Sequence, residues 1–329
     1  ALPIYIFTIY PDFKTVVLAA AAKVFYNRKG KNNMKVLNFG SLNIDYTYRL
    51  RNIVKPGETM TSAKLEIFPG GKGLNQSIAL ARAGVQVYHA GLIGSDGSFL
   101  LKTCKESGVD VSLVRECKER TGNAIIQVSE EGQNSIILFP GANRQVTEEY
   151  INMVLKNFGK GDILLLQNEI NRVDMLIDKA KEKRMKVVLN PSPYDENMEN
   201  CDLGKVDLFF LNEIEGEQIT GKTDFQEILA VMREKYPQAG VVLTVGAQGA
   251  YYSDADGYTR QEAYQAEIVD TTAAGDTFVG FFLKAIIEGQ NKKTALLWGT
   301  MAASLAISKK GAAVSIPSEE EVKQVFHCL

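Results

Sequence analysis

Short apolar runs alternate with longer helical patterns along most of the chain. The run 36–41 begins with apolar residues and ends in Gly40-Ser41, which is typical of a buried parallel strand. From residue 162 onward strands and helices alternate regularly, and this implies a parallel sheet with right-handed crossovers. The predicted strands are 36–39, 87–93, 163–167, 187–190, 208–211 and 241–245, with further strands near the edge at 249–253 and 264–269. The predicted helices are 74–83, 97–107, 173–184, 278–288, 294–308 and 318–326, with further helices up to residue 236.

Three other stretches have the alternation of partly exposed strands. They are 59–68, 123–128 and 134–139, and residues 130–133 form the turn between the last two. Because these pieces are inserted between α/β units, we expect a small sheet that covers a site as a lid. The lid strands would come from about 43–68 and 121–140, within one domain that extends over 34–329.

The first 33 residues differ from this pattern, and we treat 1–33 as an N-terminal appendage. Its apolar run, 16–22, is too short to span a membrane. Its basic residues Arg28, Lys29 and Lys31 follow the apolar run, whereas a secretory signal has them before it. A start assigned too early, a remnant of cloning and a genuine helical extension all remain open for this segment.

Composition and charge are typical of a soluble globular protein. The sequence is 45% hydrophobic and 23% charged with a formal net charge of −2, and no lysine or arginine cluster stands out. Nucleic acid and anionic membranes are therefore not expected as partners. The cysteines are scattered without C-x-x-C spacing at 104, 117, 201 and 328, which argues against a zinc site or a disulfide framework and favours a reducing cytoplasm.

The stretch Asp270-Thr271-Thr272-Ala273-Ala274-Gly275-Asp276 is the centre of the predicted chemistry. Its small residues leave backbone N–H groups free to face a ligand, and the following helix adds the positive end of its dipole, so an anion would be stabilised there. A carboxylate beside such an anion hole can take a proton from a hydroxyl that attacks the bound phosphoryl group. Asp276 could instead simply cap the helix.

Residues 216–223 match the P-loop pattern G-x-x-x-x-G-K-[ST], yet their context differs from that of a P-loop. A P-loop leaves its strand directly, whereas here Asn212 and Glu215 form the start of a capped helix. Glu217 would also place negative charge where phosphates bind. Gly221 is better explained as the end of a short helix, so we predict that Lys222 is dispensable.

Seven short motifs follow one another between residues 34 and 317. They are Gly40-Ser41-Leu42-Asn43-Ile44-Asp45, Pro69-Gly70-Gly71-Lys72-Gly73 with Asn75, Gly141-Ala142-Asn143, Asn190-Pro191, Asn212 with Glu215, Thr244-Val245-Gly246 with Gly249, and the 270–276 stretch. Each is weak alone, but in this order the set closely resembles the ribokinase family of carbohydrate kinases. The resemblance implies an α/β fold, a ribokinase-like three-layer sandwich with a central, mostly parallel sheet and a small inserted β-sheet lid.

The resemblance also implies roles for individual residues. Transfer of the γ-phosphoryl group of ATP to a sugar would use Asp276 as base and the backbone amides of Ala273, Ala274 and Gly275 as anion hole. The implied sugar-binding residues are Asn43, Asp45, Gly71, Lys72, Asn75, Glu169 and Asp276. The implied nucleotide-binding residues are Asn212, Glu215, Thr244, Gly246, Gly249 and Gly275.

Two metal ions are implied by the same resemblance. Mg²⁺ would be handled by Glu215, largely through water, because this ion sheds its hydration shell reluctantly. K⁺ would be bound at positions that contribute several backbone carbonyls, namely Asp270, Thr272, Ala306, Gly311 and Ser315. A cation there would fix the conformation of the 270–276 loop without contacting substrate.

The expected reaction is phosphorylation of the 5-hydroxyl of D-ribose, and the expected assembly is a homodimer that pairs the exposed edges of the lid. Tyr46, Asn123 and Ile125 are candidates for shaping the sugar pocket. Another sugar substrate (2-keto-3-deoxygluconate, fructose or a nucleoside) remains open. So does a non-catalytic sugar-binding protein that kept the fold.

Overall fold

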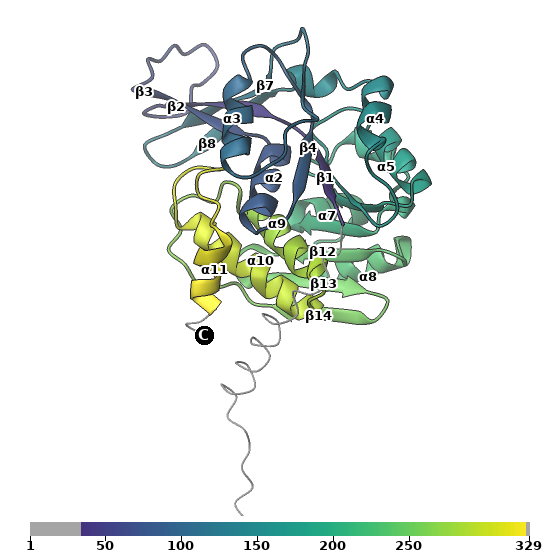
Figure 1. The fold of residues 1–329 in the computed structure, drawn as a ribbon. Coiled ribbons are helices and arrows are strands. Elements are labelled where there is room, and N and C mark those ends of the chain that lie inside the picture. Colours follow the sequence, from purple (N-terminus) through teal and green to yellow (C-terminus); the bar gives the residue numbers. More distant parts are fainter. Residues whose placement is uncertain (1–33, 327–329) are drawn as a thin grey trace, which may run out of the picture. The chain divides into compact units, whose positions relative to one another are not determined.

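A mostly parallel sheet forms the middle layer of the protein, as the alternating pattern predicts (Figure 1). The computed structural model describes residues 34–326, so the 1–33 appendage and Cys328 lie outside the described residues. The strand order is β14-β13-β12-β11-β10-β9-β1-β4. The parallel strands are β1 (Val36–Phe39), β4 (Val87–Ala90), β9 (Ile163–Gln167), β10 (Lys186–Asn190), β11 (Leu208–Asn212) and β12 (Gly240–Thr244). The antiparallel edge consists of β13 (Ala250–Asp254) and β14 (Gly257–Gln261).

Helices cover both faces of this sheet, which completes the predicted three layers (Figure 1). One face packs against α4 (Glu148–Leu155), α5 (Val173–Glu182), α7 (Glu213–Thr220) and α8 (Phe225–Lys235). The other face packs against α2 (Lys72–Arg82), α9 (Ala274–Ile287) and α10 (Lys292–Ile307). Successive strand residues point to opposite faces. Leu164 and Leu166 therefore join the core under α5, whereas Phe210 contacts the rings of Phe278 and Phe282 from α9.

The predicted lid is a separate four-stranded sheet with the order β3-β2-β7-β8. Its strands are β2 (Asn43–Arg49), β3 (Lys64–Gly70), β7 (Gly122–Val128) and β8 (Asn134–Phe139). Three residues separate the end of β1 from the start of β2, which pairs with β7 in parallel and with β3 antiparallel. Asn43 and Asp45 are therefore part of a lid strand, and any substrate bound near β1 would contact the lid directly.

On this face of the sheet, α2 and α9 are in close contact although they are about 200 residues apart in the sequence. A Cβ added at Gly280 would lie only 2.5 Å from the Cβ of Ala79, so the helices approach as closely as glycine allows. Gly280 lies one helical turn beyond Asp276, and Ala79 lies one turn beyond Asn75. The contact thus brings the first turns of both helices together.

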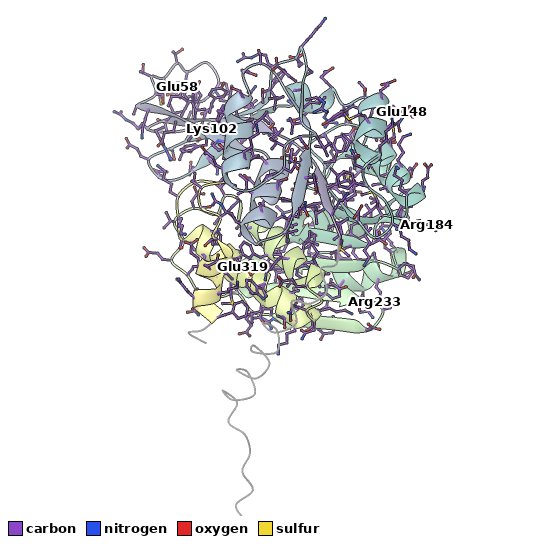
Figure 2. The ribbon with its side chains drawn as sticks, in the orientation of Figure 1. Glu58, Lys102, Glu148, Arg184, Arg233 and Glu319 are labelled. Carbon is purple, nitrogen blue, oxygen red and sulfur yellow. The ribbon has the colours of Figure 1, made fainter. Side chains whose placement is uncertain are left out.

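The C-terminal helix, α11 (Glu319–Phe326), is held on this side of the fold by a buried lysine. Lys284 of α9 is 3.1 Å from Glu319, labelled in Figure 2, and its ammonium lies 4.0 Å above the ring of Trp298. Phe326 packs on the same ring with centroids 4.8 Å apart. The other charged side chains labelled in Figure 2, such as Lys102 and Arg233, lie exposed at the periphery.

Several predicted boundaries were wrong for physical reasons. Residues 264–269 form no strand, because their backbone bonds elsewhere: Val269 N–H donates to the carbonyl of Ile307, and the edge strand is β14 instead. The predicted strand 87–93 divides at Gly91, and β5 (Leu92–Ile93) leaves the large sheet to pair with β6 (Arg115–Glu116). The structure adds α4, which the pattern did not indicate, and α9 begins four residues before the predicted 278.

The remaining elements are short or peripheral. They are α3 (Ser98–Glu106), α6 (Glu196–Glu199) and the 3₁₀ turns η1 (Gly141–Arg144), η2 (Leu203–Lys205) and η3 (Gly246–Gln248). Within residues 34–326, none of the helices combines the length and apolar character that crossing a bilayer requires.

Candidate active site

Asp276 lies in the first turn of α9 and is held there by two side-chain amides. Ala273 precedes the helix in the left-handed conformation, with φ of 60°. Asn75 Nδ2 donates to Asp276 Oδ2 over 3.0 Å, and Gln76 Nε2 donates to Asp276 Oδ1 over 2.9 Å. The carboxylate is 7% exposed. It therefore does more than cap a helix, because both its oxygens accept bonds from α2.

The three predicted anion-hole residues lie beside this carboxylate. Ala273, Ala274 and Gly275 all line a cavity of about 220 Å³ together with Asp276 and Lys72. The first turn of a helix leaves N–H groups without intrahelical partners. One of the three is partly committed, because Ala274 N–H donates to the carbonyl of Thr271 over 3.3 Å. The remaining N–H groups of the turn and the helix dipole favour an anion there.

A second polar cluster connects the end of β1, the start of α2 and the segment after β9. Glu169 Oε2 accepts from the backbone N–H of Lys72 over 2.9 Å and from the hydroxyl of Ser41. Gly71 has φ of 93°, and a Cβ there would meet Ser41 and Asn43 at 3.0–3.2 Å. Predicted sugar-binding positions that are far apart in sequence thus meet at one place.

Asn43 and Asp45 extend this cluster into the lid. Asn43 Oδ1 accepts from Asn143 Nδ2 over 2.7 Å, and Asn143 Oδ1 accepts from the backbone N–H of Leu42. Asp45 lies over Gly70, where an added Cβ would be 2.0 Å from its Oδ2. Asn43 is buried and oriented, whereas Asp45 is partly exposed.

The charges of this cluster influence one another strongly. Burial, and to a smaller extent the negative charge of the nearby Glu169, together raise the pKa of Asp45 to about 7. Burial also raises the pKa of Glu169, although Lys72 and the Ser41 hydroxyl oppose the rise. Burial alone would lower the pKa of Lys72, but the carboxylates of Asp276, Glu169 and Glu215 raise it above its usual value. Lys72 is therefore a permanent cation among the carboxylates.

Asn212 and Glu215 form the predicted helix cap. Asn212 Oδ1 accepts from the N–H groups of Ile214 and Glu215, and Glu215 Oε2 accepts from Asn212 N–H over 2.8 Å. Gly221 ends α7 with φ of 70°. Residues 216–223 are thus a helix and its end, and the P-loop interpretation is excluded by this geometry. Both capping residues also line the 220 Å³ cavity.

A larger cavity, of about 690 Å³, adjoins the first. It contains the predicted nucleotide-binding residues Thr244, Gly246, Gly249 and Gly275. Gly249 has φ of 97°, and a Cβ there would lie 2.1 Å from the carbonyl of Gln261, so no other residue fits. Thr244 and Gly275 line both cavities, which meet at the first turn of α9.

The predicted cation loop is partly assembled around Asp270. Its Oδ1 accepts from the N–H and hydroxyl of Thr272, and its Oδ2 accepts from Gly311 N–H over 2.9 Å. Burial would raise the pKa of Asp270, but these bonds lower it below its usual value, so the carboxylate is ionised. Ala306 lies in the last turn of α10, and Ser315 bonds within its own turn to Ala312; no bond ties either to Asp270 in the described part of the chain.

Comparison of the sequence with known proteins shows which family the chain belongs to. The family model for pfkB family carbohydrate kinases matches residues 33–319. The chain belongs to this family. It is therefore a carbohydrate kinase.

Individual relatives are similar over nearly their whole length. The chain is 35% identical to the ribokinase of Haemophilus influenzae, with 86% of this chain and 95% of the relative covered. It is 34% identical to the ribokinase of Staphylococcus aureus, with 88% and 99% covered. The structure of Arabidopsis thaliana ribokinase complexed with ribose and ATP has a TM-score of 0.79 and 28% identity, with 89% of this chain and 98% of that chain covered.

Two residues that contact site residues of this kinase were not predicted. Gln76 bonds to Asp276, and Asn143 orients Asn43. Asn143 belonged to a quoted motif without a role. Gln76 follows Asn75 in α2. The one signal that could have drawn attention to it is an amide at a position where the helix is buried.

Proposed function

We propose that this kinase transfers the γ-phosphoryl group of ATP to the 5-hydroxyl of D-ribose. The observation that carries the proposal is the location of Asp276, at the junction between the nucleotide-sized cavity and the polar cluster of Lys72 and Glu169. The names of the relatives support ribose over the other sugars considered, and one related structure contains ribose and ATP.

In the proposed reaction Asp276 takes the proton of the attacking hydroxyl. Asn75 lies beside it and donates to its Oδ2, and among the described residues the Oδ1 of Asn75 has no partner. Asn43, Asp45, Gly71, Lys72 and Glu169 hold the remaining hydroxyls, for which carboxylates and amides offer acceptors in nearby directions. Lid strand β2 carries two of these residues, so lid closure would exclude water from the phosphoryl group.

We assign the larger cavity to ATP. Thr244, Gly246 and Gly249 let backbone approach the phosphates, and the N–H groups of the 273–275 turn receive the transferred group as its charge develops. Asn212 and Glu215 handle Mg²⁺ mainly through water.

We assign the Asp270 loop to K⁺. The oxygen-rich set fits such a cation, because the ionised Asp270 already joins the 270–276 loop to Gly311. Thr272, Ala306 and Ser315 would complete the site with hydroxyl and carbonyl oxygens. A bound cation supplies positive charge that keeps this loop in place. If rates are unchanged when K⁺ is replaced by Na⁺ or choline, the assignment is wrong.

We further propose a homodimer formed through the lid. Strands β3 and β8 lie at the edges of the lid sheet, and apolar side chains on the lid are unusually exposed. Ile67, Ile136, Ile137 and Leu138 are each more than half exposed. Ile137→Lys should give a monomer in sedimentation equilibrium if this surface pairs, whereas an unchanged mass would contradict the proposal.

We place the reaction in a reducing cytoplasm. Cys104, Cys117 and Cys201 are free thiols, and Cys104 is buried with its pKa raised to about 12 by burial, so it is unreactive. Labelling of the native protein with a thiol reagent should modify the same number of cysteines before and after reduction.

The test of the reaction is a coupled ADP-release assay on the full chain. Substrates would be pentoses, hexoses, keto-deoxy acids and nucleosides, each with and without K⁺. We expect the highest kcat/KM with D-ribose. Asp276→Asn should abolish turnover while ribose binding remains measurable by calorimetry. Turnover that survives this change would refute the assignment of the base, and a protein inactive on every sugar would refute the proposed function.

A further inference from the structure

Gln76 is the buried centre of a chain of amides beneath Asp276. Its side chain is fully buried and lines neither cavity. Its Nε2 donates to Asp276 Oδ1 over 2.9 Å and to Asn190 Oδ1 over 3.1 Å, while its Oε1 accepts from Gln167 Nε2 over 2.6 Å. Every polar atom of this amide is therefore used.

Two backbone carbonyls determine which way these amides point. Asn190 Nδ2 donates to the carbonyl of Phe210, so its Oδ1 must face Gln76. Asn38 Nδ2 donates to the carbonyl of Gly73, so its Oδ1 faces Gln167 and accepts from Nε2 over 3.0 Å. Because carbonyls can only accept, the direction of the whole chain is fixed, and Gln76 must present its NH₂ group to Asp276.

The two oxygens of Asp276 consequently have different surroundings. Oδ1 is bonded to a residue that no ligand in either cavity can reach. Oδ2 is bonded to Asn75, which also lines neither cavity but whose own Oδ1 has no partner among the described residues. The donor to Oδ1 is therefore held in a closed chain of hydrogen bonds, whereas the donor to Oδ2 is not.

We propose that Gln76 is a positioning residue that anchors Oδ1 of Asp276 and so makes Oδ2 the oxygen that receives the proton of the sugar hydroxyl. This inference rests on the proposed role of Asp276 as base. The amide chain also joins the base to β11, whose last residue is Asn212 of the predicted magnesium element. Gln76 thereby fixes the carboxylate relative to both reactants.

The test compares variants at residue 76 in the full-length enzyme. Gln76→Met keeps the length of the side chain and removes the donor, and loss of a hydrogen bond to a charged group should lower kcat about 10- to 100-fold. The KM for ribose and for ATP should stay within about threefold, because Gln76 contacts neither ligand. Gln167→Met removes the bonds to Gln76 Oε1 and Asn38 Oδ1 but leaves the donor to Asp276 in place, so it should lower kcat by a smaller factor.

Gln76→Glu provides a readout that a purely structural role would not affect. The introduced carboxyl group can donate to Oδ1 only while protonated and repels Asp276 once ionised. The kcat of this variant should therefore fall as pH rises, while Gln76→Met stays low at every pH. If Gln76→Met does not fold, this pH profile and Gln167→Met decide the matter.

Tyr150→Phe is the matched control. Its buried hydroxyl bonds to the backbone of Gly91 and Leu113 and, within the described residues, is bonded neither to Asp276 nor to the amide chain, so its loss should lower the melting temperature without changing kcat. Wild-type kcat in Gln76→Met, or an equal fall in Tyr150→Phe, would overturn the inference and leave the proposed function intact. A wild-type protein that phosphorylates no sugar would overturn both.

Discussion

Replacing Asp45 with asparagine should stabilise the sugar-free protein at alkaline pH, although it removes a proposed sugar ligand. Burial and the charge of Glu169 raise the pKa of Asp45 to about 7 from 3.8. The folded protein therefore holds a proton that the unfolded chain releases above pH 4. Stability contributed by this proton is complete below pH 4 and is lost as pH rises toward 7.

The size of the effect follows from the two pKa values. At 1.36 kcal/mol for each pH unit, the difference corresponds to about 4 kcal/mol of unfolding free energy. Asp45 is partly exposed, and solvent screening reduces the expected effect to about 2 kcal/mol. Asparagine carries no charge at any pH, so Asp45→Asn should match the wild type near pH 4 and exceed it by this amount at pH 8.

Urea unfolding of both proteins at pH 4.5 and pH 8, without sugar, measures the difference. Glu131→Gln, an exposed position in the turn between β7 and β8, is a control whose effect should not depend on pH. Calorimetry at pH 8 should show that Asp45→Asn binds ribose more weakly. An equal gap between wild type and Asp45→Asn at both pH values would refute the account of Asp45.

Three further outcomes are expected. Lys222→Ala should leave kcat and the KM for ATP unchanged in the coupled assay, because Lys222 pairs with Glu227 at the surface, 3.5 Å away; inactivation would contradict this account of Lys222. Gly73→Ala should raise the KM for ribose about tenfold or more, because its Cβ would lie 2.3 Å from Ser41 N and displace the start of α2. A protein that begins at Met34 should fold and keep full activity, since the family match begins at residue 33; insoluble expression would show that 1–33 is needed.

The layers of the fold were predictable because strand and helix patterns are local. The runs at β9 and β12 are apolar up to their last residue, as is typical of strands buried on both faces. The strand predicted for 264–269 was wrong because apolar residues of this segment line the larger cavity instead of pairing in a sheet. Periodicity alone does not distinguish these two environments.

The site residues were predictable where a short motif carried them, as for Asp276 and the Asn212–Glu215 cap. Gln76 and Gln167 were not, because their roles depend on which strands lie side by side. The bond between Gln167 and Asn38 joins residues 129 apart, and its partners are known only once β1 and β9 are adjacent. A single sequence contains no local signal for such pairs.

The contact between Gly280 and Ala79 makes the geometry of the site depend on the absence of a Cβ atom at residue 280. Alanine is the better helix former by about 1 kcal/mol, so Gly280→Ala would look favourable from local propensity. Its Cβ would nevertheless push α9 away from α2 one turn below Asp276. The two amides that hold the Asp276 carboxylate belong to α2, and they would then be too far away to donate hydrogen bonds to it. A substitution that strengthens the helix and lies outside both cavities would thus abolish activity without unfolding the protein.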